Sequence, residues 1–477
     1  MLNTELYING QWQPAVAGGT IDIIDPATEE QVTKAAQAER ADVEAAIDAA
    51  HQAFQSWRQV PAWERSKVLR KTAQLLEERA ERIAHQLTLE CGKPLGQSKA
   101  EILNAIELID WYADEARRIF GMTLPGRNGN NRFMTVYEPV GVVGAFTAWN
   151  FPIVLQARKI APAIATGCTI VTRPAEEGTG AVVELVKCFI DAGAPAGTVN
   201  LVTGHPEVIS ETIMDDDRVR KVTFTGSIPV GQHLMRRAAD TVKRMSMELG
   251  GHAPVIVHED VDPVKTAITA AMGKSRNNGQ VCVSPTRFYV HKKHEKVFNE
   301  TFAGALAKMK IGHGLEPDTE VGPLINKKRL DFIEQMVEDT VGEGATVATG
   351  GRRPADKNKG FFYEPTVFTD VRDDMRIMND EPFGPLAPVV TFEDFDDVIE
   401  RANSLSYGLA GYVFTDSQAL AMKTMEALKT GIVGVNNYVA ATAEMPFGGV
   451  NHSGFGRENG PHGLLDYMDV KFANIVM

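Results

Sequence analysis

Short apolar segments alternate with amphipathic helical patterns over residues 140–257, and this alternation restricts the fold more than any other feature of the chain. Strands are predicted at Val140–Phe146, Thr169–Thr172, Val199–Val202, Lys221–Thr225 and Pro254–Val257. Helices are predicted between them at Ile153–Ala165, Gly180–Ala192 and Val230–Arg244. A chain that alternates in this way forms crossover connections and a parallel sheet covered on both faces. The predicted fold class is therefore α/β.

Two further regions flank this core pattern. Helical spacing of apolar residues predicts helices over 43–57, 69–87 and 98–119, and the turn-rich segment 121–132 ends that series. Beyond residue 282 a second series of strands is predicted at Phe288–His291, Thr366–Phe368, Pro388–Phe392 and Ile432–Val435. We therefore expect two α/β domains preceded by a helical lead.

The composition excludes several classes of protein. With 477 residues, of which 44% are hydrophobic and 23% charged, the chain can bury large cores. The net charge of −13 disfavours a broad surface that follows nucleic acid or an anionic membrane. The N-terminal segment lacks the pattern of a secretory signal, and the most apolar stretch, 140–157, is interrupted by polar residues and proline. We expect a soluble cytoplasmic protein that contacts neither nucleic acid nor membrane.

Four cysteines are present, and no two form a C-x-x-C pair, so neither a disulfide framework nor a metal site is predicted. Cys91, Cys168 and Cys188 lie in helical or strand patterns and are interpreted as small buried hydrophobes. Cys282 instead follows the polar segment Asn277–Val281, where backbone amides could stabilise a thiolate. Its local context alone leaves both a structural and a reactive thiol open.

Three other motifs could carry chemistry. Glu248, which precedes two glycines, could be a solvated carboxylate or a general base. Asn150, at a predicted strand-to-helix junction, could cap the helix or donate to an oxyanion. The Gly226-Ser227 turn before a helix could hold a pyrophosphate on backbone amides, although it is not a G-x-G-x-x-G motif.

Together with Glu381-Pro-Phe383-Gly-Pro, Pro446-Phe-Gly-Gly and the opening Tyr7-Ile-Asn-Gly, these motifs resemble the aldehyde dehydrogenase superfamily in order and spacing over essentially the whole chain. The branches that oxidise succinate semialdehyde or 2-oxoglutarate semialdehyde are the most similar. The resemblance implies that Cys282 attacks the aldehyde, that Asn150 and the Cys282 amide hold the oxyanion, and that Glu248 activates water. Glu458 matches a residue near the family's proton path.

The resemblance also implies a bound NAD, with NADP possible. The residues expected to bind the cofactor are Thr147, Trp149, Lys159, Arg173, Glu176, Gly226, Ser227, Val230, Leu249, Glu381 and Phe383. Lys159 is expected at the adenosine ribose and Glu381 at the nicotinamide ribose. Glu176 favours NAD, whereas Arg173 could hold the 2′-phosphate of NADP, so NAD is expected to be preferred and NADP accepted.

The substrate expectation depends on two arginines. Arg158 and Arg287 match positions at which the semialdehyde branches hold the distal carboxylate, and the alternative for both is an ordinary surface or ion-pair arginine. Three other functions stay open: a general aliphatic or aromatic aldehyde dehydrogenase, a CoA-acylating dehydrogenase, and a non-catalytic structural protein of the same fold. Glu248 disfavours the CoA-acylating branch, and the complete set of Asn150, Glu248 and Cys282 disfavours a non-catalytic protein.

The resemblance finally implies an aldehyde dehydrogenase-like architecture with a Rossmann-type NAD(P)-binding domain at 1–119 and 139–248. A catalytic domain is expected at 249–450, and an oligomerisation region at 120–138 and 451–477. The β-hairpin of that region bridges subunits in the family, so a homodimer or homotetramer is expected. His252 stands where the family usually has lysine, and the sequence assigns it no role.

Overall fold

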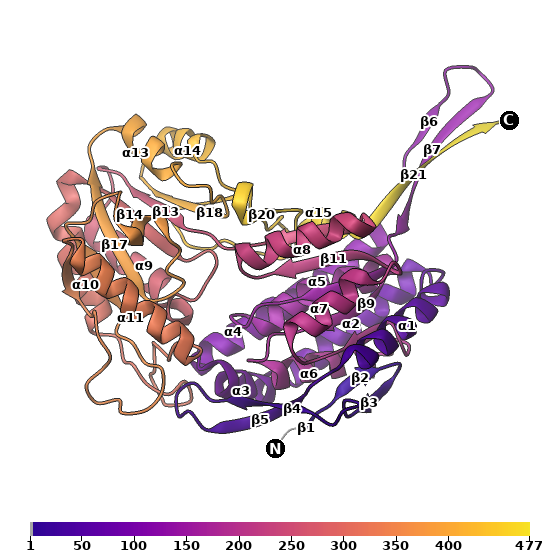
Figure 1. The fold of residues 1–477 in the computed structure, drawn as a ribbon. Helices are drawn as coiled ribbons and strands as arrows, with labels where there is room; N and C mark the ends of the chain where they lie inside the picture. The colour runs from indigo at the N-terminus through magenta and orange to yellow at the C-terminus, as the bar shows by residue number, and fades with distance from the viewer. Residues whose placement is uncertain (1–2) are drawn as a thin grey trace.

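The computed structural model describes residues 3–477 and contains two large β-sheets, each with helices on both faces (Figure 1). The larger sheet has eight strands in the order β20 (Gly454–Phe455), β12 (Arg244–Glu248), β11 (Val219–Thr225), β8 (Val142–Phe146), β9 (Thr169–Arg173), β10 (Val199–Leu201), β2 (Leu6–Ile8) and β3 (Gln11–Gln13). Strands β8 to β12 pair in parallel, and β20, β2 and β3 pair antiparallel at the two edges. The predicted α/β class is confirmed.

Helices cover both faces of this sheet. On one face pack α1 (Arg40–Trp57), α7 (Pro206–Asp215) and α8 (Ile228–Thr241). On the other pack α2 (Ala62–Glu78), α3 (Ala80–Cys91), α4 (Leu95–Glu115), α5 (Pro152–Thr166) and α6 (Thr179–Asp191). The continuous apolar character of the central strands follows from this burial on both faces.

The second sheet has seven strands in the order β15 (Thr346–Thr349), β16 (Thr366–Thr369), β17 (Leu386–Phe392), β14 (Pro285–His291), β13 (Ala253–Val257), β18 (Ala410–Phe414) and β19 (Ile432–Val435). All neighbours are parallel except β15 and β16. Its helices are α9 (Pro263–Ser275) and α10 (Glu295–Ala307) on one face, and α11 (Lys327–Gly342), α12 (Arg376–Asn379) and α13 (Phe395–Ala402) on the other. α14 (Gln418–Ala427) and α15 (Gly460–Leu465) complete the set.

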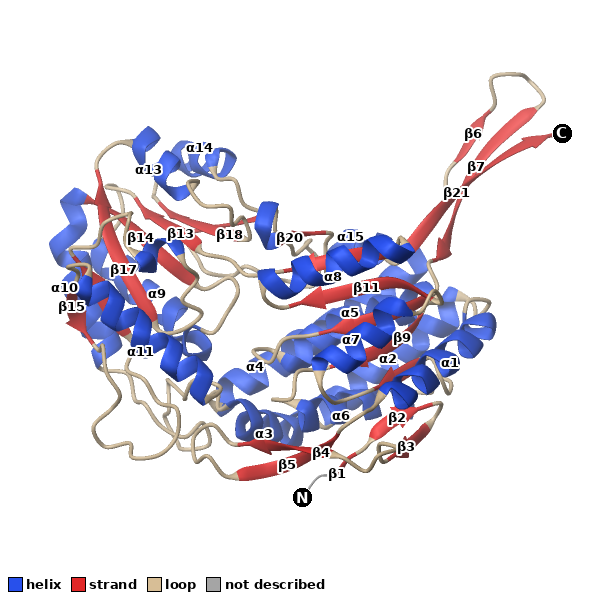
Figure 2. Ribbon diagram, viewed as in Figure 1, coloured by secondary structure: helices blue, strands red, loops and turns tan. Residues whose placement is uncertain are grey.

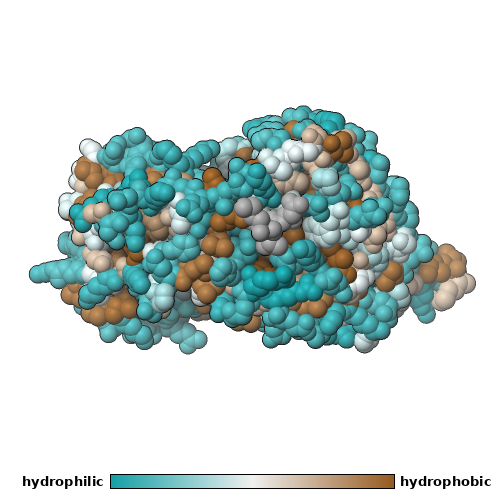
Figure 3. Space-filling model, turned by 90° about the horizontal axis from the view of Figure 1, so that it is seen from below, coloured by the Kyte–Doolittle hydropathy of each residue, from teal (hydrophilic) through white to brown (hydrophobic). Residues whose placement is uncertain are grey.

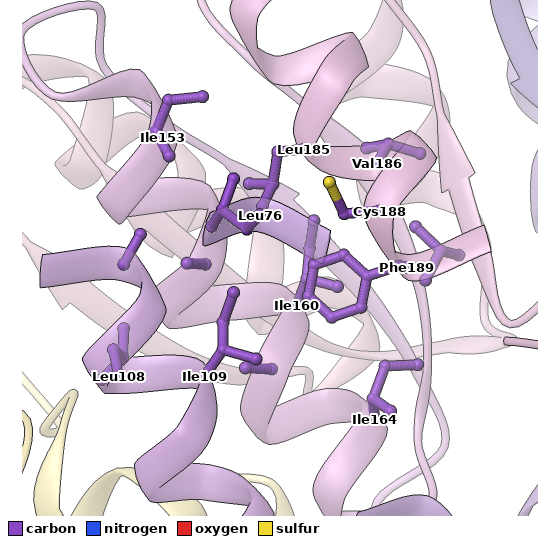
Figure 4. Close-up of a cluster of buried hydrophobic side chains, with 14 of the residues drawn as sticks. Leu76, Leu108, Ile109, Ile153, Ile160, Ile164, Leu185, Val186, Cys188 and Phe189 are labelled. Carbon is purple, nitrogen blue, oxygen red and sulfur yellow. The ribbon is translucent and has the colours of Figure 1, made fainter. Parts of the chain in front are cut away.

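Helix α5 lies in the centre of the larger core. All fifteen of its residues are buried, as expected for a helix that is surrounded by other elements. Figure 4 shows Ile160 and Ile164 of α5 among Leu76 of α2, Ile109 of α4 and Phe189 of α6. Each such side chain contributes roughly 1.5–3 kcal/mol on full burial. The packing therefore fixes the position of α5, which carries residues of the site described below.

Two small sheets lie outside these cores. One joins β1 (Asn3–Thr4), β5 (Gln31–Ala36) and β4 (Thr20–Ile24). The other joins β6 (Thr123–Pro125), β7 (Asn131–Pro139) and the C-terminal β21 (Met468–Val476), and projects from the body of the molecule (Figures 1 and 2). The hairpin and its C-terminal strand occur where they were predicted, and Val470 and Phe472 are 62% and 63% exposed.

Several element predictions were wrong in extent. The expected helix over 69–87 is two helices, α2 and α3, separated at Arg79 (φ −103°, ψ 2°). Both helices present their apolar residues to one core, so the spacing alone does not reveal the break. The helix expected over 230–244 ends at Thr241, and strand β12, which was not predicted, begins at Arg244. Strand β18 was missed because glycines at 408 and 411 interrupt its apolar run.

The domain boundaries stay a prediction. Residues 249–252 connect the last parallel strand of the larger sheet to the first strand of the smaller one, whereas β20 returns to the larger sheet from the predicted oligomerisation region.

No helix within residues 3–477 is long and apolar enough to cross a membrane. On the face seen in Figure 3, hydrophilic side chains predominate and apolar ones are scattered among them.

Candidate active site

A cavity of about 860 Å³ is lined by residues that follow β8, β11 and β12 and by loops at 276–283, 381–383 and 438–444. Asn150, Glu248 and Cys282 all lie on its wall. They come from the carboxyl ends of β8 and β12 and from the loop between α9 and β14. The ends of neighbouring parallel strands meet at one edge of a sheet, which is where α/β proteins bind ligands.

The loop that carries Cys282 has a strained backbone. Asn277, Asn278 and Gly279 have φ values of 46°, 53° and 71°. A side chain at Gly279 would collide with the carbonyl of Gly384, so only glycine allows the close approach. Side-chain amides support the strained residues, since Asn278 Nδ2 donates to the Gly322 carbonyl at 3.0 Å. Such strain in a well-supported loop is typical of functional sites.

The surroundings of Cys282 favour its protonated thiol form. Burial raises its pKa to about 12, Arg158 opposes this increase, and the nearby carboxylates Glu248 and Glu381 add to it. The thiolate is the nucleophilic form, so the site must remove this proton before attack.

The side chain of Asn150 is oriented by the same loop. Its Nδ2 donates to the Gln280 carbonyl at 3.2 Å. A primary amide has two N–H donors, so a second one remains for a ligand oxygen. This geometry suits the predicted role of Asn150 as an oxyanion donor.

Glu248 at the end of β12 is buried, and its Oε2 has no hydrogen-bond partner among residues 3–477. Burial raises the pKa of Glu248 well above its usual range, and the carboxylate of Glu458 adds to the increase. A carboxyl group with a raised pKa and a free oxygen can accept a proton near neutral pH.

Lys159 does not lie where it was predicted. It is fully buried, does not line the cavity, and donates from Nζ to Glu458 Oε1 at 2.6 Å and to Thr223 Oγ1 at 3.1 Å. The expectation that it contacts the adenosine ribose is therefore wrong. Its side chain leaves α5 toward β11 and Glu458, because adjacent helical residues point about 100° apart and Arg158 takes the cavity side. Glu458 is buried beside the site and does not line the cavity.

The remaining residues predicted to bind the cofactor all line the cavity, namely Thr147, Trp149, Arg173, Glu176, Gly226, Ser227, Val230, Leu249, Glu381 and Phe383. Ser227 precedes α8 and makes no side-chain capping hydrogen bond, so the amides of Ile228 and Val230 in the first turn stay available to an anion, whereas Pro229 has no N–H to donate. Glu176 forms an ion pair with Arg173. These groups suit a pyrophosphate and an adenosine ribose.

Glu381 also lines the cavity. Its Oε1 accepts from the Gly251 amide at 3.0 Å, and Gly250 leaves room where a side chain would collide with the carboxylate. Burial raises the pKa of Glu381 to about 7, against the lowering effects of that amide, Arg329 and Lys274. A carboxylate held in this way can accept hydrogen bonds from sugar hydroxyls. The residues present therefore fit a dinucleotide.

The two arginines predicted to bind the substrate differ in their position relative to the cavity. Arg158 lines the cavity, with its guanidinium 4.3 Å from the ring centroid of Phe447. Arg287 is buried in β14, where it donates to the carbonyls of His252 and Ala402 at 3.0 and 2.8 Å, and it does not line the cavity. The prediction for Arg287 is wrong, because the strand directs its side chain away from the nucleophile.

Arg276 was missed and lines the cavity instead. It begins the loop that carries Cys282, six residues before the nucleophile, and its guanidinium lies 5.1 Å from the ring centroid of Phe151. Its position in that loop was the available signal, whereas Arg287 lies within an apolar strand pattern.

His252, which had no predicted role, is a buried structural residue. Nε2 lies 3.0 Å from the Ile377 carbonyl, so it carries the proton, and Nδ1 accepts from Thr286 Oγ1 at 2.8 Å. Burial and the neighbouring Arg287 lower the pKa of His252 well below its usual range. The ring is therefore neutral, which avoids a further buried cation beside Arg287.

This combination of fold, thiol, amide and carboxyl defines a class of enzyme that oxidises carbonyl compounds through a cysteine. The family model for the aldehyde dehydrogenase family matches residues 12–473, so the chain belongs to that family. It is an NAD(P)-dependent aldehyde dehydrogenase, as the sequence predicted.

Similar proteins include the glutarate-semialdehyde dehydrogenase of Pseudomonas putida, which is 40% identical over 99% of this chain and 98% of that protein. The NADP(+) succinate-semialdehyde dehydrogenase of Escherichia coli is 38% identical over 99% and 98% of the two chains. A solved NAD+ complex of an aldehyde dehydrogenase from Bacillus cereus is 38% identical, with a TM-score of 0.97 over 100% of this chain and 97% of that one.

The protonation of Cys282 leads to a prediction on its reactivity. In the protein without cofactor, the rate of alkylation by iodoacetamide should rise about tenfold per pH unit from pH 6 to 9, because the pKa lies above that window and the thiolate fraction grows in proportion. Mass spectrometry of the modified peptide measures the rate. Cys282→Ala is the control, since the other three cysteines are buried. A plateau below pH 8 would contradict the raised pKa.

Proposed function

We propose that this aldehyde dehydrogenase oxidises a dicarboxylic semialdehyde to the dicarboxylate through a thioester on Cys282. The observation that carries the proposal is that two arginines, Arg158 and Arg276, line the cavity that also contains the catalytic cysteine. The names of the relatives from P. putida and E. coli, which act on glutarate and succinate semialdehydes, support the same substrate class.

The chemistry follows from the positions of the side chains. The Cys282 thiol loses its proton to solvent, and the thiolate sulfur bonds to the aldehyde carbon as the C=O π bond breaks. The resulting oxyanion accepts hydrogen bonds from the Asn150 amide and the Cys282 backbone N–H. The nicotinamide, when bound, supplies the acceptor for the hydride that converts this adduct to a thioester. Glu248 then takes a proton from the water that attacks the thioester carbon, and the thiol leaves as the acid forms.

The two arginines remain available to an anion. Arg158 is buried, its Nε has no hydrogen-bond partner among residues 3–477, and its only carboxylate within 4 Å there is Glu458, 3.9 Å from Nη1. Arg276 is exposed, and among residues 3–477 its guanidinium lies over the Phe151 ring and forms no side-chain hydrogen bond or ion pair. A bidentate contact from a guanidinium is suited to a carboxylate, and a neutral aldehyde leaves it unused.

Substitution of either arginine tests the substrate class. Arg158→Leu and Arg276→Leu should each lower kcat/KM for succinate or glutarate semialdehyde by about 10- to 100-fold, the range for loss of a hydrogen bond to a charged group. The value for butanal should fall much less, because butanal has no carboxylate to lose that contact and is affected only through the influence of Arg158 on the pKa of Cys282. Arg236→Leu, an exposed arginine on α8, is the matched control. Equal losses on charged and neutral aldehydes would contradict carboxylate recognition.

The role of Glu248 separates hydrolysis of the thioester from the alternatives. Glu248→Gln should still form the thioester and release a burst of NAD(P)H in stopped flow. Steady-state turnover should then fall by about 10²- to 10⁴-fold, because water lacks its base. Cys282→Ala should give no burst. Undiminished turnover of Glu248→Gln would contradict its role as the base. Acyl-CoA formation by the native enzyme when CoA is added would indicate the CoA-acylating reaction. The absence of activity on any aldehyde would indicate a structural protein.

We also propose that NAD is preferred and NADP accepted. Glu176 lies on the cavity wall and neutralises Arg173 through their ion pair, which leaves no free cation there for a 2′-phosphate. Glu176→Gln should therefore raise the ratio of kcat/KM for NADP over NAD by about tenfold or more, since it removes a repelling charge and releases Arg173. Glu211→Gln on the exposed face of α7 is the control. An unchanged ratio would show that Glu176 does not face the ribose.

We infer that the chain forms a homodimer or homotetramer through the projecting sheet of β6, β7 and β21. Exposed apolar side chains on β21, including Val470 and Phe472, support this role because exposed apolar strands tend to be covered by a partner. A cytoplasmic location is inferred from the four free cysteines, which are typical of a reducing compartment.

A further inference from the structure

A buried ion pair lies next to the site, and no step of the proposed reaction uses it. Lys93, between α3 and α4, and Glu101 on α4 are both completely buried, and Lys93 Nζ lies 2.5 Å from Glu101 Oε2. A buried ion pair is weak support for stability, because both charges lose their hydration. Its contacts therefore give the better guide to what it does.

Each charge contacts a different part of the turn that carries Asn150. Lys93 Nζ donates to the Asn150 carbonyl at 2.6 Å. Glu101 Oε1 accepts from the amides of Ile153 and Val154, the first turn of α5, at 2.8 and 3.3 Å. The pair thus holds both the carbonyl before the helix and the amides that begin it, which an apolar pair of the same volume could not do.

The same region holds the loop of the nucleophile. The side-chain Nδ2 of Asn277 donates to the same Asn150 carbonyl at 3.0 Å. The backbone N–H of Asn277 donates to Gln97 Oε1 on α4 at 2.7 Å. The corner between α3 and α4 therefore contacts the Asn150 turn directly and the Cys282 loop through Gln97. It fixes the separation between the Asn150 side chain and the loop that presents Cys282.

We propose that Lys93 and Glu101 are positioning residues that hold the Asn150 amide where the oxyanion forms. Neither lines the cavity, so neither touches the substrate. The inference rests on the proposed function of Asn150 as an oxyanion donor. Its substrate can be any aldehyde that the enzyme oxidises, so it does not depend on the semialdehyde assignment.

A double-mutant cycle on the rate of the NAD(P)H burst tests the proposal. Asn150→Ala should slow the burst by about 10²- to 10³-fold, the usual effect of one oxyanion donor. Lys93→Met should slow it by about tenfold or more and leave the dissociation constant of NAD unchanged, because only the donor is displaced. In the Asn150→Ala background, Lys93→Met should have less than about a twofold further effect, since the donor is already absent.

The controls separate positioning from stability. Lys99→Met removes a lysine from an exposed part of α4 and should leave the burst rate unchanged. If Lys93→Met does not fold because Glu101 is left unpaired, the double variant Lys93→Met with Glu101→Gln removes both charges and takes its place in the cycle. A full, additive effect of the Lys93 change in the Asn150→Ala background would overturn the positioning role. A normal burst in Asn150→Ala alone would instead overturn the proposed role of Asn150.

Discussion

The complete burial of α5 is the constraint on which the site depends. A helix with no exposed face must still place two consecutive cations, Arg158 and Lys159, in a low-dielectric interior. Burial of an unpaired charge is too unfavourable to persist, so each needs a partner or a cavity. Lys159 pairs with Glu458, and Arg158 enters the cavity, where a ligand anion can complete its hydrogen bonds.

The same low dielectric acts on the acidic groups. Burial raises the pKa values of Cys282, Glu248 and Glu381 together, so each of these groups holds a proton more tightly than it would in water. Arg158 opposes the increase at both Cys282 and Glu248, which couples substrate recognition to the state of the nucleophile. A carboxylate bound at Arg158 would weaken this effect, so the hydrogen bonds from Asn150 and from the Cys282 backbone are needed to favour the anionic adduct.

The sequence predicted most of the larger sheet because apolar strands and amphipathic helices alternate there with clear periodicity. It also placed the nucleophile, the amide and the base in one family pattern. The site predictions that failed concern side chains whose direction is set by tertiary contacts and not by the local sequence pattern. The directions of Lys159 and Arg287 depend on which neighbour each side chain meets. Arg276 lines the cavity from the start of a loop whose positive φ angles at 277–279 no periodicity describes. Lys93 and Glu101 lie more than 50 residues before the residues that they contact in the Asn150 turn. Only the fold reveals that the pair contacts this turn.

Local charge, rather than the net charge of the chain, determines what the cavity can bind. The protein carries a net charge of −13, yet two arginines line the wall near Cys282. Exposed charges are screened beyond about 10 Å at 0.1 M salt, whereas the buried guanidinium of Arg158 acts at contact distance in a medium of low dielectric. An acidic surface is therefore compatible with selection of an anionic aldehyde. The selectivity arises after the substrate enters the cavity, where Arg158 gains a partner that the protein itself does not fully provide.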